Sequence, residues 1–385
     1  EGPWKAYVVN AQTEADRGDP PYTDPNRGFI SLSVSDTENT SQDEKGVIHG
    51  VTGSDIKFDI NFNGTIAADA PNRNAIVRVE YHNYTCEHLI FVHQGNRPQK
   101  LLSDKPAWHV SNLVSKNREA SNPLDEGSLF KYKNLDQPIA AKNQYSSKIP
   151  MIDVTSKDFP DPVSNQNRYE LVGGEIKKWM EITNQPANNK EASWGLDLTS
   201  TRIAQIEDYE ALFENEMIAQ GYGVLYGDES TEPKTNIVDA YGYQEDQAYY
   251  FGGSAIKDRG IRGCFVYNRN TGNHIFLPVG ASGYGHRKAK EGNGVLRYSC
   301  GQTQIFPTNP NGFYTDASTA PLFYDLYMRP GAIYWTEDAG TGTWGTTVGW
   351  DINYFTFDFN RIYEANVFNG NNSDACFIRC VEDPN

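Results

Sequence analysis

Short runs of alternating apolar and polar residues, separated by clusters of turn-forming residues, dominate the first hundred positions of the chain. Successive side chains of a β-strand point to opposite faces, so this alternation predicts strands with one buried face. The runs cover residues 29–34, 56–62, 75–81 and 89–94, and turn formers such as Asn63-Gly64 lie between them. Together they predict a two-sheet β-sandwich over residues 1–98.

The composition of the whole chain favours the same structural class. Its 385 residues are enough for two or three domains, and they include 34 glycines, 20 prolines and 12% aromatic residues. Such a mixture is typical of short strands joined by turns and long polar loops rather than of a helical bundle. We therefore predict a multi-domain, β-rich protein.

The charge and the apolar runs of the chain restrict its partners. A net charge of −16 repels phosphate backbones, so we expect no nucleic acid partner. No apolar run approaches the roughly 18 residues of a membrane helix, and we expect no transmembrane segment in this chain. Because the sequence opens at Glu1 without an apolar signal segment, we expect any export signal or lipid anchor to lie upstream.

A change in pattern at residues 96–98 predicts a linker, after which a second domain covers residues 99–385. This domain is predicted to be of the α+β class with long loops. Within it, the stretch 146–189 is rich in Asn, Asp, Ser and Pro, which predicts a long irregular insertion.

One amphipathic helix is predicted over residues 201–220, with Thr199 or Ser200 as its cap and with Gly221 and Gly223 ending it. We expect it to cover the sheet formed by the last strand of the chain. The apolar residues at helical spacing are Ile203, Ile206, Tyr209, Leu212 or Phe213, and Met217. Phe213→Ala is expected to cost about 3 to 5 kcal/mol of stability.

Five cysteines form neither a CxxC pair nor a zinc-ribbon spacing: Cys86, Cys264, Cys300, Cys376 and Cys380. On one extended strand, Cys376 and Cys380 would lie about 13 Å apart, too far for a disulfide. Either they pair with upstream partners such as Cys264 or Cys300, or they are small buried hydrophobic residues. We favour buried free thiols.

The first quarter of the chain resembles a known type of module. Gly64-Thr65, the run 73–77 and a strand ending in Val92-His93-Gln94 are similar to the small Ig-like modules, of the BACON or fimbrillin type, of Bacteroidetes surface and fimbrial proteins. The resemblance implies an Ig-like first domain and an extracellular or outer-membrane location.

The rest of the chain resembles the C-type-lectin-like domains of the Fibrobacter succinogenes major paralogous type. The segments that carry the likeness are 108–113, 127–132, 274–280, 283–285 and the closing run 375–381, with its aromatic, Arg, Cys and Val. The sequence departs from the family at 198–201, where a Pro-Thr-type turn and a preceding Cys are absent. This departure argues against a disulfide between the helix and Cys380.

Domains of this type usually bind ligands and only occasionally catalyse. The resemblance therefore implies a non-catalytic protein of cell adhesion or ligand recognition, such as a fimbrial tip or accessory subunit. Its partners would be host or bacterial surface glycans or proteins, and other fimbrial subunits. The alternative is a glycan-binding module of a polysaccharide-uptake system. A less favoured alternative is a redox or sulfatase-modifying enzyme, since formylglycine-generating enzymes share the fold; it would use Cys376 or Cys380 with Arg379 as the positive neighbour.

The Gly/Thr-rich region from 329 to 360 is the predicted recognition face, because the loops before the last two strands hold ligands in lectin-like folds. Flat rings beside acid and amide groups suit sugars or extended peptides. The predicted ligand-binding residues are Trp335, Trp344, Trp350, Asp351, Asn353 and Tyr354. We expect at least one tryptophan ring to be accessible beside Asp351 or Asn353; the competing interpretation places all three rings in the core.

No cofactor is predicted. The run 350–353 has the residue types of a calcium-dependent sugar site but not their order, so calcium stays open as an alternative. His82, Cys86 and His88 could share one strand face with a soft metal, although we favour ordinary strand-end residues. The sequence contains no GxSxG, HExxH, P-loop or dinucleotide fingerprint, and we predict that the protein is not an enzyme.

Overall fold

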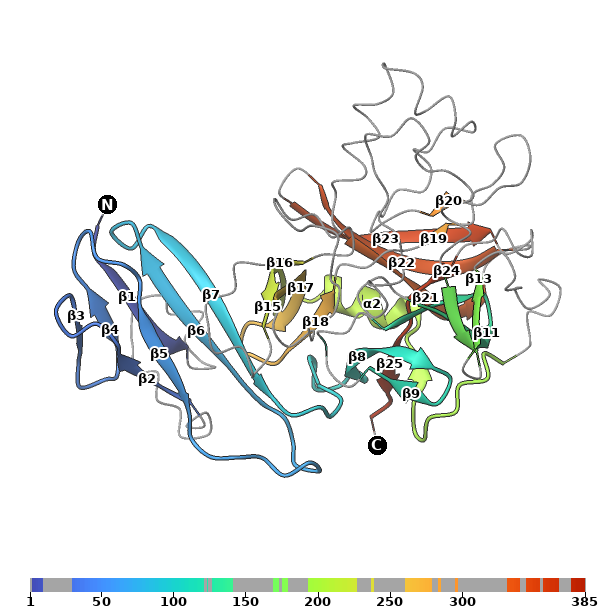
Figure 1. Ribbon diagram of the computed structural model, residues 1–385, viewed down its shortest axis with the longest axis horizontal. Coiled ribbons are helices and arrows are strands. Elements are labelled where there is room, and N and C mark those ends of the chain that lie inside the picture. Colours follow the sequence, from blue (N-terminus) through green and yellow to red (C-terminus); the bar gives the residue numbers. More distant parts are fainter. Residues whose placement is uncertain are drawn as a thin grey trace, which may run out of the picture. The chain divides into compact units, whose positions relative to one another are not determined.

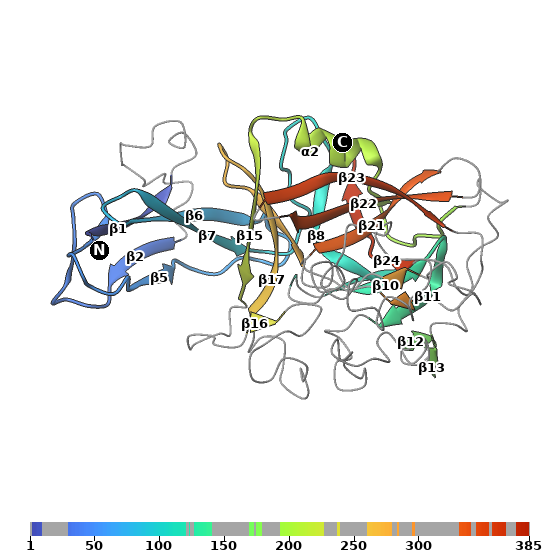
Figure 2. The ribbon, with the colours of Figure 1, turned by 90° about the horizontal axis from the view of Figure 1, so that it is seen from above.

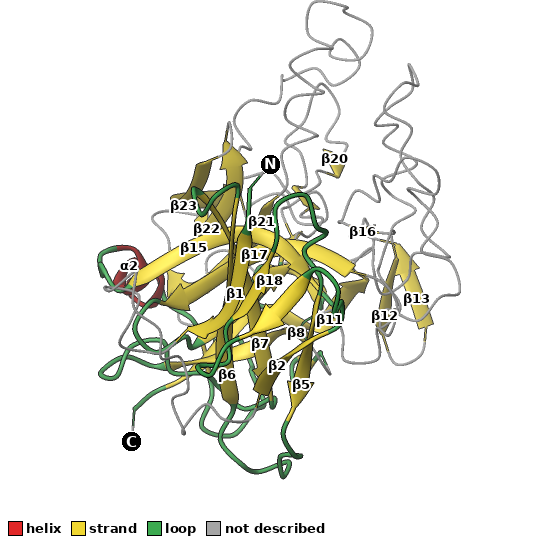
Figure 3. Cartoon of the chain, turned by 90° about the vertical axis from the view of Figure 1, so that its left-hand side faces the viewer, coloured by secondary structure: helices red, strands yellow, loops and turns green. Residues whose placement is uncertain are grey.

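The computed structural model of the protein describes residues 2–9, 30–120, 123, 127–140, 169–172, 175–178, 193–226, 237–238, 260–278, 283–284, 295–296, 331–339, 344–353, 356–366 and 375–384. Within these ranges the chain forms strands and loops and a single α-helix, α2 (Figure 3). The prediction of a β-rich protein is confirmed. None of the helical structure in these ranges is long and apolar enough to cross a membrane.

The chain divides into two compact units. The first unit comprises 1–103 together with two later segments, 216–219 and 267–275; the second comprises 104–215, 220–266 and 276–385. The change from one unit to the next at Ser103 and Asp104 follows shortly after the predicted linker at 96–98. The two later segments were predicted to belong to the second domain, 99–385, and they lie in the first unit instead.

The first unit contains two antiparallel sheets, drawn from dark blue to cyan in Figure 1 and seen as two layers in Figure 2. The five-stranded sheet has the order β3-β4-β1-β6-β7, and β2 pairs with β5 in the other. The strands are β1 (Trp4–Val9), β2 (Ile30–Val34), β3 (Thr40–Gln42), β4 (Ile48–Gly50), β5 (Phe58–Phe62), β6 (Arg73–Tyr81) and β7 (Cys86–Gln94). The four predicted runs correspond to β2, β5, β6 and β7.

Side chains from both sheets of the first unit form one apolar core. Trp4 is its largest buried side chain, and the indole N–H of Trp4 donates a hydrogen bond of 3.0 Å to the Ser54 hydroxyl. A side chain at Gly50 would overlap the Trp4 ring, so this position of β4 accepts only glycine. The buried members of the core are Trp4, Ala6, Ile30, Leu32, Ile48, Ala75, Val77, Val79 and Val92.

The opposite face of the five-stranded sheet buries a second apolar cluster, to which the later segments contribute. Tyr7 and Val9 of β1 point to this face because side chains alternate along a strand. They meet Ala219 and Tyr267, one from each later segment. The two segments are therefore part of the first unit's own core.

The strands of the second unit form several further sheets. A seven-stranded sheet has the order β13-β12-β11-β10-β24-β19-β20, a four-stranded sheet the order β14-β25-β8-β9, and a three-stranded sheet the order β21-β22-β23; β17 pairs with β15, β16 and β18. The strands are β8 (Ala107–Ser115), β9 (Arg118–Glu119), β10 (Ser128–Lys131), β11 (Asn134–Ala140), β12 (Tyr169–Val172), β13 (Glu175–Lys178), β14 (Arg202–Ile203), β15 (Ile218–Leu225), β16 (Ile237–Val238), β17 (Gly260–Asn268), β18 (His274–Pro278), β19 (Gly283–Tyr284), β20 (Val295–Leu296), β21 (Gly331–Ala339), β22 (Trp344–Asn353), β23 (Thr356–Asn366), β24 (Ala375–Cys376) and β25 (Arg379–Glu382).

The stretch 146–189 was predicted to be irregular, yet it contains the hairpin β12–β13. Its first strand pairs with β11, where Glu170 lies opposite Ile139. Cross-strand pairing with an existing sheet edge stabilises a short strand whose own sequence has weak periodicity. The prediction of an irregular insertion is therefore wrong for these eight residues, 169–172 and 175–178.

The predicted helix over 201–220 is shorter than expected. Helix α2 (Ile206–Phe213) begins after Gln205, not after Thr199 or Ser200. Ile203 instead lies in β14, where it pairs with Cys380 of the terminal strand β25, and Gly221 and Gly223 lie in β15. Pairing with a strand distant in sequence outweighs the local helical periodicity at the start of this segment.

The helix contacts the sheet that contains the terminal strand, as predicted, through Tyr209 of the predicted apolar residues. Tyr209 packs its ring edge-on against Trp108 of β8 at 4.8 Å, and Trp108 lies opposite Val381 of β25. Leu212 is 2% exposed, whereas Phe213 is only half-buried. The buried face of the helix is therefore Tyr209 and Leu212.

Leu212→Ala should lower the free energy of unfolding by about 3 kcal/mol, because it opens a cavity in a closed core. Phe213→Ala removes a ring that still contacts water and should cost less than half as much. Urea unfolding of the two variants, followed by circular dichroism, measures the difference. An equal or larger loss for Phe213→Ala would show that Phe213 is the anchoring side chain.

The closing run 375–381 was predicted to be one strand, and it is two. β24 pairs with β10 and β19, whereas β25 pairs with β14 and β8 in another sheet. Between the two strands, the backbone N–H of Trp335 donates to the Phe377 carbonyl at 2.9 Å, and the backbone N–H of Leu113 donates to the Ile378 carbonyl at 3.0 Å. These bonds satisfy the backbone where the chain passes from one sheet to the next.

Candidate functional site

Trp335, predicted to bind ligand, is a core residue of the second unit. Its side chain is 0% exposed, and its indole N–H donates a 2.7 Å hydrogen bond to the Phe130 carbonyl. The rings of Tyr132 and Trp194 lie 5.5 and 6.1 Å away. A ring enclosed on all sides cannot stack on a ligand, so the predicted role of Trp335 is wrong.

The other predicted ligand-binding residues lie in a sheet rather than in a loop. Trp344, Trp350, Asp351 and Asn353 belong to β22, which pairs with β21 on one side and β23 on the other. Threonine, valine and aromatic residues favour strands, and the glycines of this region did not prevent pairing. Tyr354 lies outside the described residues, and the ligand-binding role of these five residues stays a prediction.

The zinc alternative finds no geometric support in the described ranges, whereas the calcium alternative at 350–353 stays open because the side chains there are not among those described. In the described ranges, no group of three or more His, Cys, Asp or Glu side chains lies close enough to hold a metal ion. His82 occupies the β6–β7 turn with a left-handed backbone, φ 51°, while His88 lies in β7 opposite Val79. The turn separates residues that the even spacing placed on one strand.

Cys264 and Cys380 are buried free thiols, as the sequence analysis favoured, and Cys376 is buried as well. Cys86 is free but exposed, and Cys300 lies outside the described residues. Burial raises the pKa of the Cys380 thiol well above its ordinary value, and the positive charge of Arg379 offsets this only in part. The enzyme alternative required a solvent-reactive Cys376 or Cys380, and both side chains are 0% exposed.

Arg379 is a fully buried guanidinium that holds three elements of the second unit together. Its Nε–H donates to Asn112 Oδ1 at 2.8 Å, Nη1 to the His109 carbonyl at 2.9 Å, and Nη2 to the Phe276 carbonyl at 3.0 Å. The Asn112 amide in turn donates to the Tyr334 hydroxyl at 3.3 Å. The planar fork of arginine suits several acceptors at fixed directions, so this residue acts in the core rather than in catalysis.

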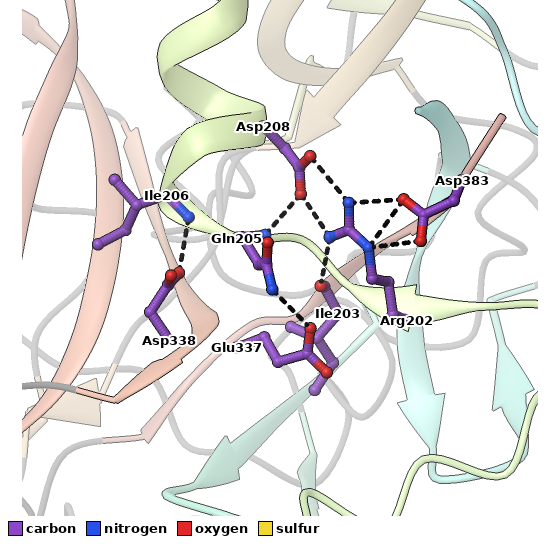
Figure 4. Close-up of polar contacts among 8 residues, drawn as sticks. All are labelled: Arg202, Ile203, Gln205, Ile206, Asp208, Glu337, Asp338 and Asp383. Carbon is purple, nitrogen blue, oxygen red and sulfur yellow. Dashed lines mark hydrogen bonds and ion pairs between the residues drawn. The ribbon is translucent and has the colours of Figure 1, made fainter. Parts of the chain in front are cut away.

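Four carboxylates gather around the start of helix α2, as Figure 4 shows: Asp208, Glu337, Asp338 and Asp383. Arg202 binds Asp208 through two parallel hydrogen bonds of 2.6 and 3.0 Å. The same guanidinium donates to Asp383 at 2.8 Å. Arg202 therefore joins β14 and helix α2 to the chain that follows β25.

The remaining contacts in Figure 4 cap the helix. Asp208 accepts the Gln205 backbone N–H at 2.7 Å, and Asp338 accepts the Ile206 N–H at 2.7 Å. The Gln205 amide donates to Glu337 at 3.3 Å. These acids satisfy helix N–H groups that have no acceptor within the helix, and their negative charge suits its N-terminus. We conclude that the cluster is structural.

A groove on the first unit is the best candidate for a binding site. It has a volume of about 480 Å³ and lies between β5 and the strand pair β6–β7. Its apolar lining consists of Ile56, Phe58, Ile60, Val79, Ile90 and the ring of Tyr81, and its polar groups are those of Lys57, His88 and the Tyr81 hydroxyl.

The groove exists because one side of the sandwich is incompletely covered. On β2 the inward-facing Ile30 and Leu32 are buried, whereas on β5 the inward-facing Phe58 and Ile60 are only half-buried. Phe62, at the end of the same face, is 51% exposed. β5 and β7 are the outermost strands of their sheets along this side. The groove therefore combines apolar side chains with the edge of a strand.

Comparisons with protein-family models, with curated proteins and with solved structures yield no match.

Apart from His88, which was weighed as a metal ligand, no groove residue was predicted to bind a ligand, although part of the signal was present. Phe58, Ile60 and Phe62 alternate with Asp59 and Asn61, which correctly predicts a strand with one apolar face. The alternation does not show how many neighbouring strands cover that face. The groove depends on the two-stranded sheet being narrower than the sheet it covers.

Proposed function

We propose that the protein is a non-catalytic recognition protein of cell adhesion, which binds an extended segment of another polypeptide along the groove of its first unit. The observation that carries the proposal is the apolar groove beside the outer strand β5. An adhesive surface protein, such as a fimbrial tip or accessory subunit, would use it for a surface protein or for another subunit.

The chemistry of the groove favours a polypeptide over a sugar. A strand added to the edge of β5 would exchange main-chain hydrogen bonds with it, while every second side chain would enter the groove. The lining accepts apolar side chains at Phe58, Ile60 and Ile90. A sugar would need several converging polar groups, and the lining supplies only those of Lys57, His88 and the Tyr81 hydroxyl.

We also propose that the first unit is an Ig-like domain and the second a C-type-lectin-like domain. Two antiparallel sheets around one core support an Ig-like first domain. The closing segment lies in the core of the second unit, with Ile378 and Cys380 buried, which supports a C-type-lectin-like second domain. An adhesin at the bacterial surface is consistent with both.

Display of random octapeptides on phage, selected against the full chain, tests the proposal. We expect the enriched peptides to alternate apolar and polar residues and to lose binding when a central proline removes a strand N–H. Ile60→Glu should weaken their binding at least tenfold, because it places a charge in the groove. Asn61→Glu adds the same group one residue further on, facing away from the groove, and should change binding less than twofold.

Two outcomes would refute the groove as a peptide site. One is selection of no peptide over background; the other is selection of peptides that bind the Ile60→Glu chain as well as the wild-type chain. A glycan array with the same protein examines the alternative of a glycan-binding module, to which the buried Trp335 lends no support.

A further inference from the structure

The main chain of β5 has one edge that no other described strand covers. In the described ranges β5 pairs with β2 alone, and Ile60 lies opposite Leu32. The Leu32 carbonyl accepts the side-chain amide of Gln42 at 2.9 Å, and Gln42 belongs to β3 in the other sheet. This carbonyl therefore points away from β5. The preceding carbonyl of β2, that of Ser31, lies on the β5 side, where it accepts the Asn61 side-chain amide at 3.4 Å.

These directions determine which main-chain groups of β5 face its uncovered edge. In an antiparallel pair, opposite residues alternate between pairs that exchange main-chain hydrogen bonds and pairs that do not. Because Leu32 turns its carbonyl away from β5, it forms a pair of the second kind with Ile60. The N–H and C=O of Ile60 therefore point to the uncovered edge, and those of Phe58, two residues earlier, point the same way. Phe58 and Ile60 thus present their side chains to the groove and their main-chain groups to the edge beside it.

The groove contains basic groups although the chain as a whole is acidic. The net charge of the chain is −16, yet none of the described residues that line the groove is acidic. Lys57 supplies an ammonium group and His88 an imidazole N–H. Neither side chain forms a hydrogen bond or an ion pair within the described part of the chain. Both residues are exposed, so a ligand in the groove can reach them.

Asp36 is a carboxylate on which Lys57 acts electrostatically, but its own turn already holds it. Asp36 accepts the Asn39 side-chain amide at 2.9 Å and the Glu38 backbone N–H at 3.1 Å. The hydrogen bond from Asn39 is the main cause that lowers the pKa of Asp36, and the charge of Lys57 is a minor one. The ammonium group of Lys57 therefore remains available to a carboxylate from a ligand.

The two basic residues lie at the same end of the groove. Lys57 directly precedes Phe58, whose ring lies 6.3 Å from that of Trp4 at the start of β1. The start of β1 pairs with the end of β6, and the end of β6 pairs with the start of β7. His88 is in the first half of β7. Both basic groups therefore lie at the end where β5 begins, and Ile60 lies further along the groove.

We propose that the occupant of the groove is an acidic strand, antiparallel to β5, whose Asp or Glu side chain binds Lys57 and His88. This inference rests on the proposed function, and it names the chemistry of the partner. Antiparallel pairing is the more stable kind, and opposite charges across an interface give it specificity. Because the ligand runs opposite to β5, it passes Ile60 first and Phe58 next. Its acidic residue therefore follows its apolar residues in the sequence.

The octapeptides selected on phage give the first readout. We expect most of them to carry Asp or Glu two residues after the last apolar residue of the alternation, since alternate residues face the groove. A synthetic copy of the most enriched peptide, with its acid replaced by the matching amide, should bind at least threefold more weakly in calorimetry. Selected peptides without an excess of acidic residues at this position would overturn the inference.

Charge reversal tests whether Lys57 contacts the acid. Lys57→Glu should weaken binding of the most enriched peptide at least tenfold, and a peptide with lysine in place of its acid should recover most of the loss. Lys45→Glu is the matched control, because it makes the same change in charge on an exposed residue of the β3–β4 turn, outside the groove lining. It should change the affinity less than twofold. His88→Phe keeps a ring without an N–H donor and should reduce the preference for acid over amide at least twofold. An unchanged preference in the Lys57→Glu chain would overturn the inference.

Methylation of single main-chain nitrogens of the same peptide tests the direction of the strand. In an antiparallel pair, the peptide residues that face the groove are those that bond to Phe58 and Ile60. Methylation at these positions should weaken binding at least tenfold, and methylation at the positions between them should change it less than twofold. The reverse pattern is that of a parallel strand and would overturn the inference.

The outcomes separate this inference from the proposed function. Peptides that lose binding to the Ile60→Glu chain but carry no acid would overturn the acidic strand and leave the groove as a peptide site. Selection of no peptide over background would overturn both.

Discussion

Replacing Arg379 with methionine should lower the free energy of unfolding of the second unit by about 4 kcal/mol. Methionine fills much of the volume but removes the guanidinium donors from three buried acceptors: Asn112 Oδ1 and the carbonyls of His109 and Phe276. Each unsatisfied buried group costs about 1 to 3 kcal/mol. Removal of a buried charge, which is itself costly to desolvate, offsets part of this sum.

Urea unfolding followed by tryptophan fluorescence measures the loss, because Trp4 is the one tryptophan of the chain before Trp108 and the remainder report on the second unit. Arg118→Met is the matched control. Arg118 is exposed in β9, and its replacement should change stability by less than about 0.5 kcal/mol. Arg379→Lys should remain well below the wild type, since one ammonium cannot reach three acceptors set apart by the guanidinium fork. A loss below about 1 kcal/mol for Arg379→Met would mean that the buried guanidinium stabilises little.

The strands of the first unit were predictable where one face of the strand meets water. β5 alternates Phe58 and Ile60 with Asp59 and Asn61, so the sequence alone showed its inner face. β1 was not predicted, because both of its faces are buried. Its Trp4 points into one core and its Tyr7 into the other, which removes the alternation on which the prediction depended.

Local sequence patterns could not predict the segments whose structure depends on partners that are distant in the sequence. Ile203 fits a helical period, yet Cys380 pairs with it in β14 and β25, and no feature near Ile203 reveals that partner. The packing of Tyr267 against β1 and of His274 against His93 of β7 also joins segments that are distant in the sequence. Such pairings depend on the global topology, which propensity and periodicity do not contain.

The candidate site illustrates the same limit. The tryptophans between 329 and 360 marked a region rich in rings, but composition could not show whether a given ring faces the core. The pairing of β21 with β22 fixes the face of Trp335. A shift of one residue in this register would have turned its side chain to the other face of the sheet.

Trp335→Ala should therefore destabilise the second unit without acting on a ligand. Truncation of a buried tryptophan costs about 3 to 5 kcal/mol, and the loss of its N–H leaves the Phe130 carbonyl without this donor. For a unit of this size we expect the melting temperature to fall by about 10 °C. Tyr132 and Trp194, which pack against the ring, would border the cavity.

Trp335→Phe separates the two parts of this effect, because it keeps an aromatic ring and removes only the indole N–H. It should recover more than half of the lost stability, since the cavity outweighs one hydrogen bond of about 1 kcal/mol. Calorimetry of both variants gives the melting temperatures, and binding of the groove-selected peptides gives the functional readout at a temperature where both remain folded. Peptide binding should be unchanged, since Trp335 is not among the residues that line the groove. If Trp335→Ala instead kept its stability and lost binding, the ring would be part of the recognition face and the groove would not be the binding site.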